Sequence, residues 1–170
     1  MKKYLYPISF IVICIVIIVW WWFCSSITTI VLIRHADRDG ENDALTQQGL
    51  DRADEFVHVA EKLEATTIYH SGANRTELTV TPLATALGIT MIEQADSAAT
   101  INDILNNHRG ETVIVAGHSN TVPQMIELAG GPALANIQST EYDNMFVLTR
   151  CNCWFGGTKL LNFQYGAVSP

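Results

Sequence analysis

TTIVLIRHADRDGEN, residues 28–42, begins as an apolar run and ends in a cluster of charge. The apolar residues are continuous rather than alternating, and this predicts a strand over 28–33 that is buried on both faces. Arg34 and His35 follow directly, with no turn residue to separate them from the strand. A guanidinium and an imidazole at the end of a buried strand need an explanation from the rest of the chain.

Strands and helices alternate on the C-terminal side of this stretch. Helices are predicted over 46–63, with Thr46 as its cap, over 73–87, ending at Gly88, over 98–107, and after residue 119. Further strands are predicted over 66–70, 89–93, 111–117, 145–150 and 158–165, the last two forming a hairpin through Gly156 and Gly157. The pattern predicts an α/β three-layer sandwich, in which a mostly parallel central sheet has helices on both faces and an antiparallel addition at its end.

The N-terminus has a different character. Residues 7–24 are apolar throughout and follow Lys2 and Lys3, and a membrane-spanning helix needs roughly 17–25 such residues. We therefore expect residues 1–26 to form a signal anchor and residues 27–170 to form one domain outside the cytoplasm, in a periplasmic or extracellular location. The alternative is a cleaved signal peptide, which would leave the domain secreted.

Charge and cysteine content limit the partners. The formal net charge of −7 argues against nucleic acid, because phosphate backbones are bound by basic surfaces. Cys151 and Cys153 lie two positions apart in a predicted strand, with Cα atoms about 6.6 Å apart, at the edge of the range for a disulfide. Two strand thiols are therefore favoured over a strained disulfide.

Several polar residues fall at the carboxyl ends of the predicted strands, where open α/β sheets bind ligands. Two arginines match the bidentate geometry of phosphate oxygens, and helix N-termini add amide donors. No Gly-rich nucleotide loop occurs, so the anion is expected to be the transferred group, without cofactor or metal. The candidate substrate-binding residues are Arg34, Arg75, His118, Ser119 and Asn120.

Histidine can form covalent intermediates, and His35 is the candidate nucleophile. An acceptor on its second ring nitrogen would fix the tautomer. His35 would attack phosphorus and water would then hydrolyse the phosphohistidine, while Arg34, Arg75 and His118 spread the charge of the equatorial oxygens.

Three blocks, VLIRHADRDGENDALTQQGLDRADE, SGANRTELTVTPLATALGI and VIVAGHSNTVPQMI, resemble the histidine phosphatase superfamily, which has the phosphoglycerate mutase-like fold. The resemblance covers residues 28–166 and is greatest to the small members, some of them exported and membrane-tethered. It implies a metal-independent phosphatase with His35 as the phosphorylated residue and Arg34, Arg75 and His118 as its phosphate pocket. The implied substrate is a phosphorylated small molecule or phosphoprotein.

The sequence departs from the family pattern in two places. Ala36 replaces a glycine, a change that should be tolerated if its φ is negative. The usual glutamate proton donor has no clear counterpart, and Glu93, Asp96 and Asp37 are the acids available. Without an acid, good leaving groups such as phosphohistidine or aryl phosphates would be favoured.

Other interpretations are less favoured. His35, His70 and His118 could bind zinc, but the arginines would oppose a dication. Arg34 could be a surface partner of Asp37 or Asp39. A serine hydrolase built on Ser71 lacks the G-x-S-x-G motif. A non-catalytic phosphate-binding module and a phosphomutase are the alternative functions, and the loops 36–45, 94–100 and 130–144 would set specificity.

Overall fold

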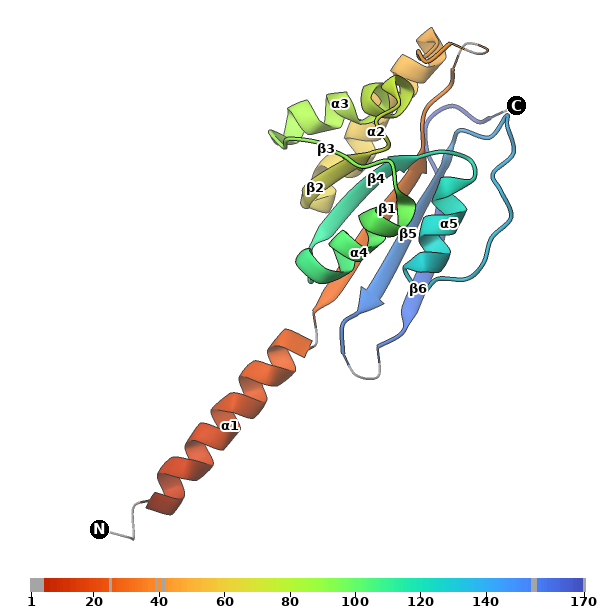
Figure 1. Cartoon of the computed structure of the whole chain (residues 1–170). Helices are drawn as coiled ribbons and strands as arrows, with labels where there is room; N and C mark the ends of the chain where they lie inside the picture. The colour runs from red at the N-terminus through yellow and green to blue at the C-terminus, as the bar shows by residue number, and fades with distance from the viewer. Residues whose placement is uncertain (1–4, 25, 39, 41, 154–155, 170) are drawn as a thin grey trace.

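A six-stranded sheet forms the centre of the domain in this computed structural model, which describes residues 5–24, 26–38, 40, 42–153 and 156–169 (Figure 1). The strand order is β3-β2-β4-β1-β5-β6. β2, β3, β4 and β1 are parallel, and β5 runs antiparallel to both β1 and β6. The strands are β1 (Ile27–Arg34), β2 (Ala65–His70), β3 (Ile92–Glu93), β4 (Thr112–Gly117), β5 (Asn144–Cys151) and β6 (Thr158–Gln164).

Helices cover both faces of the sheet. The helices are α2 (Gln47–Ala60), followed by a short 3-10 helix η2 (Glu61–Leu63), α3 (Asn74–Leu87), α4 (Ser97–Asn107) and α5 (Thr121–Leu128). Residues of α2 and α3 pack in one apolar cluster, and residues of α4 and α5 pack in another on the opposite face. The predicted three-layer arrangement of the domain is confirmed.

The first strand explains why the core has two halves. Ile30 and Leu32 belong to the cluster with α4 and α5, whereas Val31 and Ile33 belong to the cluster with α2 and α3. All four are completely buried, because successive side chains of a strand point to opposite faces. Burying each such side chain stabilises the fold by roughly 1.5–3 kcal/mol.

Local signals set the ends of two helices as predicted. The Thr46 hydroxyl accepts a hydrogen bond from the Gly49 amide at 3.1 Å and caps α2. Gly88 ends α3 with φ 66°, the left-handed conformation that suits glycine. The predicted strand 89–93 is shorter than expected, because only Ile92 and Glu93 pair with β2.

The expectation of two strand thiols is wrong, because the structure joins Cys151 and Cys153 in a disulfide. β5 ends at Cys151, so Cys153 lies beyond the strand in a bend. The bend brings the two Cα atoms to 5.4 Å, shorter than the spacing of about 6.6 Å in a continuous strand.

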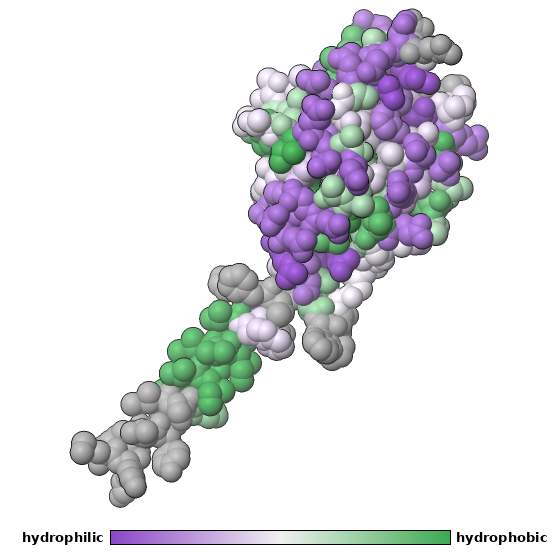
Figure 2. Space-filling model, viewed as in Figure 1, coloured by the Kyte–Doolittle hydropathy of each residue, from purple (hydrophilic) through white to green (hydrophobic). Residues whose placement is uncertain are grey.

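Helix α1 (Leu5–Cys24) projects from the domain (Figure 1). Side chains are described for its residues 10–20, and Figure 2 shows hydrophobic surface there. Among the residues that the structure describes, no helix is long and apolar enough to cross a membrane. Residues 1–4 and 25 of the expected anchor lie outside the described residues. The prediction of a membrane helix finds no support here, and export of the domain stays a prediction.

Gly49 offers a test of how the loop after β1 packs on α2. A Cβ added at Gly49 would lie 2.2 Å from the carbonyl oxygen of Asp37, whereas one added at Gly157 would meet nothing within 4 Å. Gly49→Ala is expected to lower the free energy of unfolding by about 1–3 kcal/mol, because the backbone after His35 must move. Thermal denaturation of both variants measures this, and an equal effect of Gly157→Ala would contradict it.

Candidate functional site

Three neighbouring strands end at the same rim of the sheet. In the pairing registers, Arg34 at the end of β1 lies opposite Gly117 of β4, and His70 at the end of β2 lies opposite Ala116. The residues that follow these strands, His35, Ser71 and His118, are therefore brought to one place. The tertiary structure thus joins residues that are up to 84 positions apart in the chain (118 − 34).

His35 lies at this rim, almost completely buried. Its Nδ1 lies 2.8 Å from the carbonyl oxygen of Ala36. Since a carbonyl can only accept, Nδ1 carries the proton and Nε2 keeps its lone pair. Burial, together with the charges of Arg34 and Arg75, lowers the pKa of His35 to about 4. His35 is therefore a neutral imidazole with a free Nε2 at neutral pH.

Ala36 keeps this arrangement without strain. Among the described residues, Glu64 is the non-glycine residue with a positive φ, so Ala36 does not need glycine. Its amide donates to the Thr79 hydroxyl of α3 at 2.9 Å. Alanine thus fits where the histidine phosphatase pattern has glycine, as expected for a negative φ.

His118 is held by two neighbours. Arg75 Nη2 donates to His118 Nδ1 at 3.3 Å, so Nε2 carries the proton and donates to the Ser71 hydroxyl at 2.8 Å. Burial and the charge of Arg75 lower the pKa of His118. The His118 ring meets the His35 ring edge-on, with centroids 5.6 Å apart. Both histidines are therefore held neutral beside arginine.

Arg34 is fixed by the connection between α5 and β5. Its Nη1 donates to the carbonyl oxygens of Gln138, Ser139 and Glu141 at 2.8–3.0 Å. The Tyr142 ring covers its guanidinium, with the centroid 4.1 Å from Cζ, within the range of a cation–π contact. The connection between α5 and β5 therefore contacts Arg34 twice, through three backbone carbonyls on Nη1 and through the Tyr142 ring over the guanidinium.

Each arginine keeps one buried donor without a partner. Among the described residues, the buried side-chain polar atoms with no hydrogen-bond partner are Arg34 Nε, Arg75 Nε and Tyr165 Oη. Leaving a buried donor unsatisfied costs about 1–3 kcal/mol, more if it is charged. Two such guanidinium donors beside two histidines can be satisfied by an oxyanion.

Asp37 is not available as a proton donor. Its carboxylate accepts from Arg52 Nε at 2.6 Å, and Arg52 is 1% exposed. Arg52 also donates to the carbonyl oxygens of Tyr165 and Ala167. Asp37 is therefore half of a buried structural ion pair, and this pair also excludes the surface pairing of Asp37 with Arg34. Asp39 lies outside the described residues.

The other candidate acids have different positions. Glu93 is exposed and its carboxylate lies against Gly72, since a Cβ built on Gly72 would be 2.6 Å from Glu93 Oε1. Asp96 caps α4 by accepting from two amides of its first turn. Asp143, which is not among the predicted acids, is buried and accepts from Gln164 and Ser169. Among these three, Glu93 lies beside the rim.

The remaining predicted residues, Ser119 and Asn120, and the alternative metal ligand His70 have no contact with the two arginines among the described hydrogen bonds. The Ser119 carbonyl accepts from Ile137 at 2.9 Å, and Asn120 precedes α5 without a side-chain capping bond. His70 is 6% exposed, and its Nδ1 accepts from the Gly72 amide. In the described part of the chain, no group of three or more His, Cys, Asp or Glu side chains could hold a metal ion.

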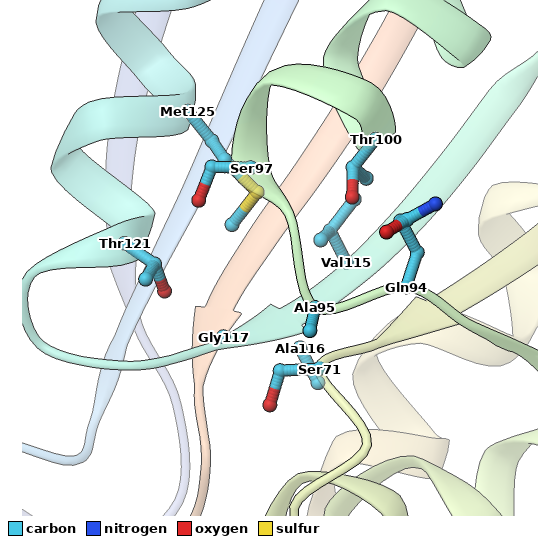
Figure 3. A pocket seen from close by; sticks show the side chains of 10 residues that line it. All are labelled: Ser71, Gln94, Ala95, Ser97, Thr100, Val115, Ala116, Gly117, Thr121 and Met125. Carbon is cyan, nitrogen blue, oxygen red and sulfur yellow. The ribbon is translucent and has the colours of Figure 1, made fainter.

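A small cavity lies beside the rim. Figure 3 shows Ser71, Gly117 and Thr121 among its lining residues, on the side of α4 and α5. Its volume is about 10 Å³, which is enough for about one water molecule. Neither Arg34 nor Arg75 lines this cavity.

Sequence reasoning missed two charged residues of this region. Arg38 adds positive charge to the site. Burial is the largest cause that lowers the pKa of Arg34 and of His118, and the charge of Arg38 is a smaller cause in the same direction for both. Its position three residues after His35 in the same loop could have indicated it. Asp43 contacts Arg75, and no local pattern announces this, because the path of the loop decides it.

Comparison with known proteins gives the fold but no sequence match. No known family model matches the chain, and no curated protein matches it. Solved structures do match. SixA, named as a phosphohistidine phosphatase, from Nakamurella multipartitia has a TM-score of 0.60 at 20% identity, covering 84% of this chain and 99% of that one.

Two further solved structures have the same fold as this chain. A mycobacterial glucosyl-3-phosphoglycerate phosphatase with VO3 has a TM-score of 0.64 at 13% identity, covering 81% of this chain and 99% of its own. Phosphoglycerate mutase from Plasmodium falciparum has a TM-score of 0.53 at 16% identity, with coverages of 85% and 94%. The chain has the phosphoglycerate mutase-like fold. The predicted fold of the domain is thereby confirmed.

The ionisation of His35 can be measured directly. We expect the His35 imidazole to titrate with a midpoint near pH 4, as its pKa of about 4 implies. Inorganic phosphate should raise this midpoint, because a bound anion favours the imidazolium form. Long-range ¹H–¹⁵N NMR, with the His35→Ala spectrum for assignment, follows the titration. A midpoint near 6.5 that phosphate does not change would contradict the prediction.

Proposed function

We propose that this protein is a phosphatase that hydrolyses a phosphomonoester or a phosphohistidine through a covalent phosphohistidine on His35. One observation carries the proposal: buried, unpartnered Nε donors of Arg34 and Arg75 lie at the rim where His35 presents a free Nε2. The donors suit phosphate oxygens, and the imidazole suits attack on phosphorus. The shared fold with solved phosphatases agrees with this assignment.

The reaction would take two in-line steps. In the first, the Nε2 lone pair of His35 forms a bond to phosphorus, and the bond from phosphorus to the leaving oxygen or nitrogen breaks. In the second, water attacks the phosphohistidine, the P–N bond breaks with its electron pair returning to Nε2, and phosphate leaves with the proton that the water loses on one of its oxygens. The Nδ1–H group of His35 stays hydrogen-bonded to the Ala36 carbonyl, and this bond fixes the orientation of the ring. Arg34, Arg75 and protonated His118 stabilise the charge on the equatorial oxygens.

Anion binding would change the state of His118. In the structure its Nδ1 accepts from Arg75, so it cannot donate to a phosphate oxygen from that atom. A bound phosphate raises the pKa of His118 by adding negative charge. Its Nδ1 can then be protonated and turn from Arg75 to the anion. His118 would therefore take up a proton with the substrate.

The proton donor would set the range of leaving groups. Glu93 is the proposed donor because it lies against Gly72, next to Ser71, which holds His118. It is exposed, so it has no fixed contact with the reacting atoms. Phosphohistidine and aryl phosphates, which leave with little help, are therefore the proposed substrate class.

The same open position of Glu93 favours a second candidate function, a non-catalytic phosphate-binding module on the same fold. It would keep both arginines and bind phosphate without turnover. A phosphomutase is the third candidate, and the cover of residues 130–144 is the part of the chain that would have to enclose its substrate.

Substitution of the nucleophile tests the proposed activity. His35→Ala is expected to reduce hydrolysis of p-nitrophenyl phosphate, without added metal, by about 10³-fold or more. The circular dichroism spectrum should be retained. His58→Ala, an exposed histidine on α2, should keep wild-type activity. Phosphate binding without turnover by the wild type would favour the module, and isomerised phosphoglycerates would indicate a mutase.

A second substitution tests the proton donor. Glu93→Gln is expected to slow an alkyl phosphate by about 100-fold and an aryl phosphate only a few-fold, because poorly acidic alcohols need protonation. Glu77→Gln, exposed on α3, is the matched control for charge. If Glu93→Gln affected both substrates equally, or neither, Glu93 would not be the donor.

A further inference from the structure

Asp43 makes an unusual set of contacts for a residue in a surface loop. Its carboxylate accepts from Arg75 Nη1 at 2.7 Å and from the amides of Asn74 and Arg75 at 2.8 and 3.3 Å. Asn74 Nδ2 also donates to the Asp43 carbonyl at 2.6 Å. These amides belong to the first turn of α3, whose N-cap residue Ala73 makes no side-chain bond. Asp43 therefore caps α3 and holds Arg75 at once.

The two arginines of the rim are held in the same manner. In each arginine, Nη1 donates hydrogen bonds to protein oxygens. The acceptors are three backbone carbonyls for Arg34 and the Asp43 carboxylate for Arg75. In each, Nε is buried without a partner. For Arg75 the Nη2 atom points to His118. Since the guanidinium is a rigid planar fork, fixing Nη1 fixes the direction of the Nε–Nη2 edge.

We propose that Asp43 is a positioning residue for Arg75, which aims the Nε–Nη2 edge of its guanidinium at the oxyanion beside His118. This inference rests on the proposed function, because Arg75 is one of the two arginines that would bind the phosphate of the substrate. Asp43 does not touch the substrate. The Asp43 carboxylate binds Nη1 of Arg75, as three backbone carbonyls bind Nη1 of Arg34. It also links the loop after β1 to the start of α3.

Two other roles of Asp43 fit the geometry less well. As a proton donor it would have to be protonated, yet the amide of Asn74 and the charge of Arg75 lower its pKa. As an internal competitor it would occupy the edge that the anion needs. It instead contacts Nη1, and leaves the buried Nε without a partner.

The sign of one measurement separates positioning from competition. A carboxylate beside an anion site repels the anion, so its removal alone should tighten anion binding. Positioning predicts the opposite, because Arg75 would lose its fixed direction and part of the binding energy with it. The experiment uses the full chain and two probes, p-nitrophenyl phosphate turnover and inorganic phosphate binding by calorimetry.

Three variants are compared with the wild type, and Asp43→Glu, which keeps the charge, serves as the restoring variant. Asp43→Asn keeps a capping side chain but loses the charge that fixes Arg75, and Asp43→Ser keeps a cap but is too short to reach the guanidinium. Both are expected to weaken phosphate binding about tenfold, with unchanged thermal stability. Asp54→Asn, an exposed acid on α2, removes the same charge elsewhere and should leave phosphate binding unchanged.

Each outcome either supports or contradicts the positioning role of Asp43. Weaker binding in both Asp43 variants, with a raised KM and intact stability, supports the proposal. Tighter or unchanged phosphate binding in the Asp43 variants overturns the positioning role. In that case, hydrolysis of p-nitrophenyl phosphate by the wild-type protein would still support the proposed function. If the wild type neither binds nor hydrolyses phosphate esters, both proposals fail. If the Asp43 variants lose stability and binding together, and Asp43→Glu does not restore binding, Asp43 is only a helix cap.

Discussion

The arrangement of the site depends on one constraint: two guanidinium groups lie at one rim of the sheet with part of their hydrogen-bonding capacity unmet. Arg34 and Arg75 each have a buried Nε without a partner, and the nearby imidazoles of His35 and His118 are kept neutral by burial and by the arginine charges. A positive field in a place of low dielectric is strong. An oxyanion would relieve the repulsion and satisfy the donors together, and this is the basis of the proposal that the site binds phosphate.

The rest of the fold maintains that constraint. β1 is buried on both faces, so the residues after it cannot move away from the core without exposing apolar surface. The Asp37–Arg52 pair and the contact of Gly49 with the Asp37 carbonyl fix the next part of the loop. Breaking such a buried pair by removing one partner commonly costs about 3–5 kcal/mol. Residues outside the proposed anion site therefore hold the loop at the rim in place.

Much of the fold could be predicted because its signals are local. Continuous apolar runs, the Thr46 cap and the left-handed Gly88 each act over a few residues, so the predicted helices and strands mostly agree with the structure. Cys153 was misplaced because a bend after β5, rather than a continued strand, sets the distance to Cys151. Asp37 was a candidate acid only until the structure showed the buried Arg52 beside it.

The sequence alone determined that a strand buried on both faces ends in Arg34 and His35, and that arginine and histidine recur after later strands. Strand order is a long-range property, so only the tertiary structure decided that β4 lies between β1 and β2 and brings Gly117 opposite Arg34. It also decided which oxygen faces each polar atom: Ala36 for His35, Ser71 for His118 and Asp43 for Arg75. Hydrogen bonds need atoms within about 3 Å, and residue type and spacing cannot fix a distance that depends on how loops from different strands pack.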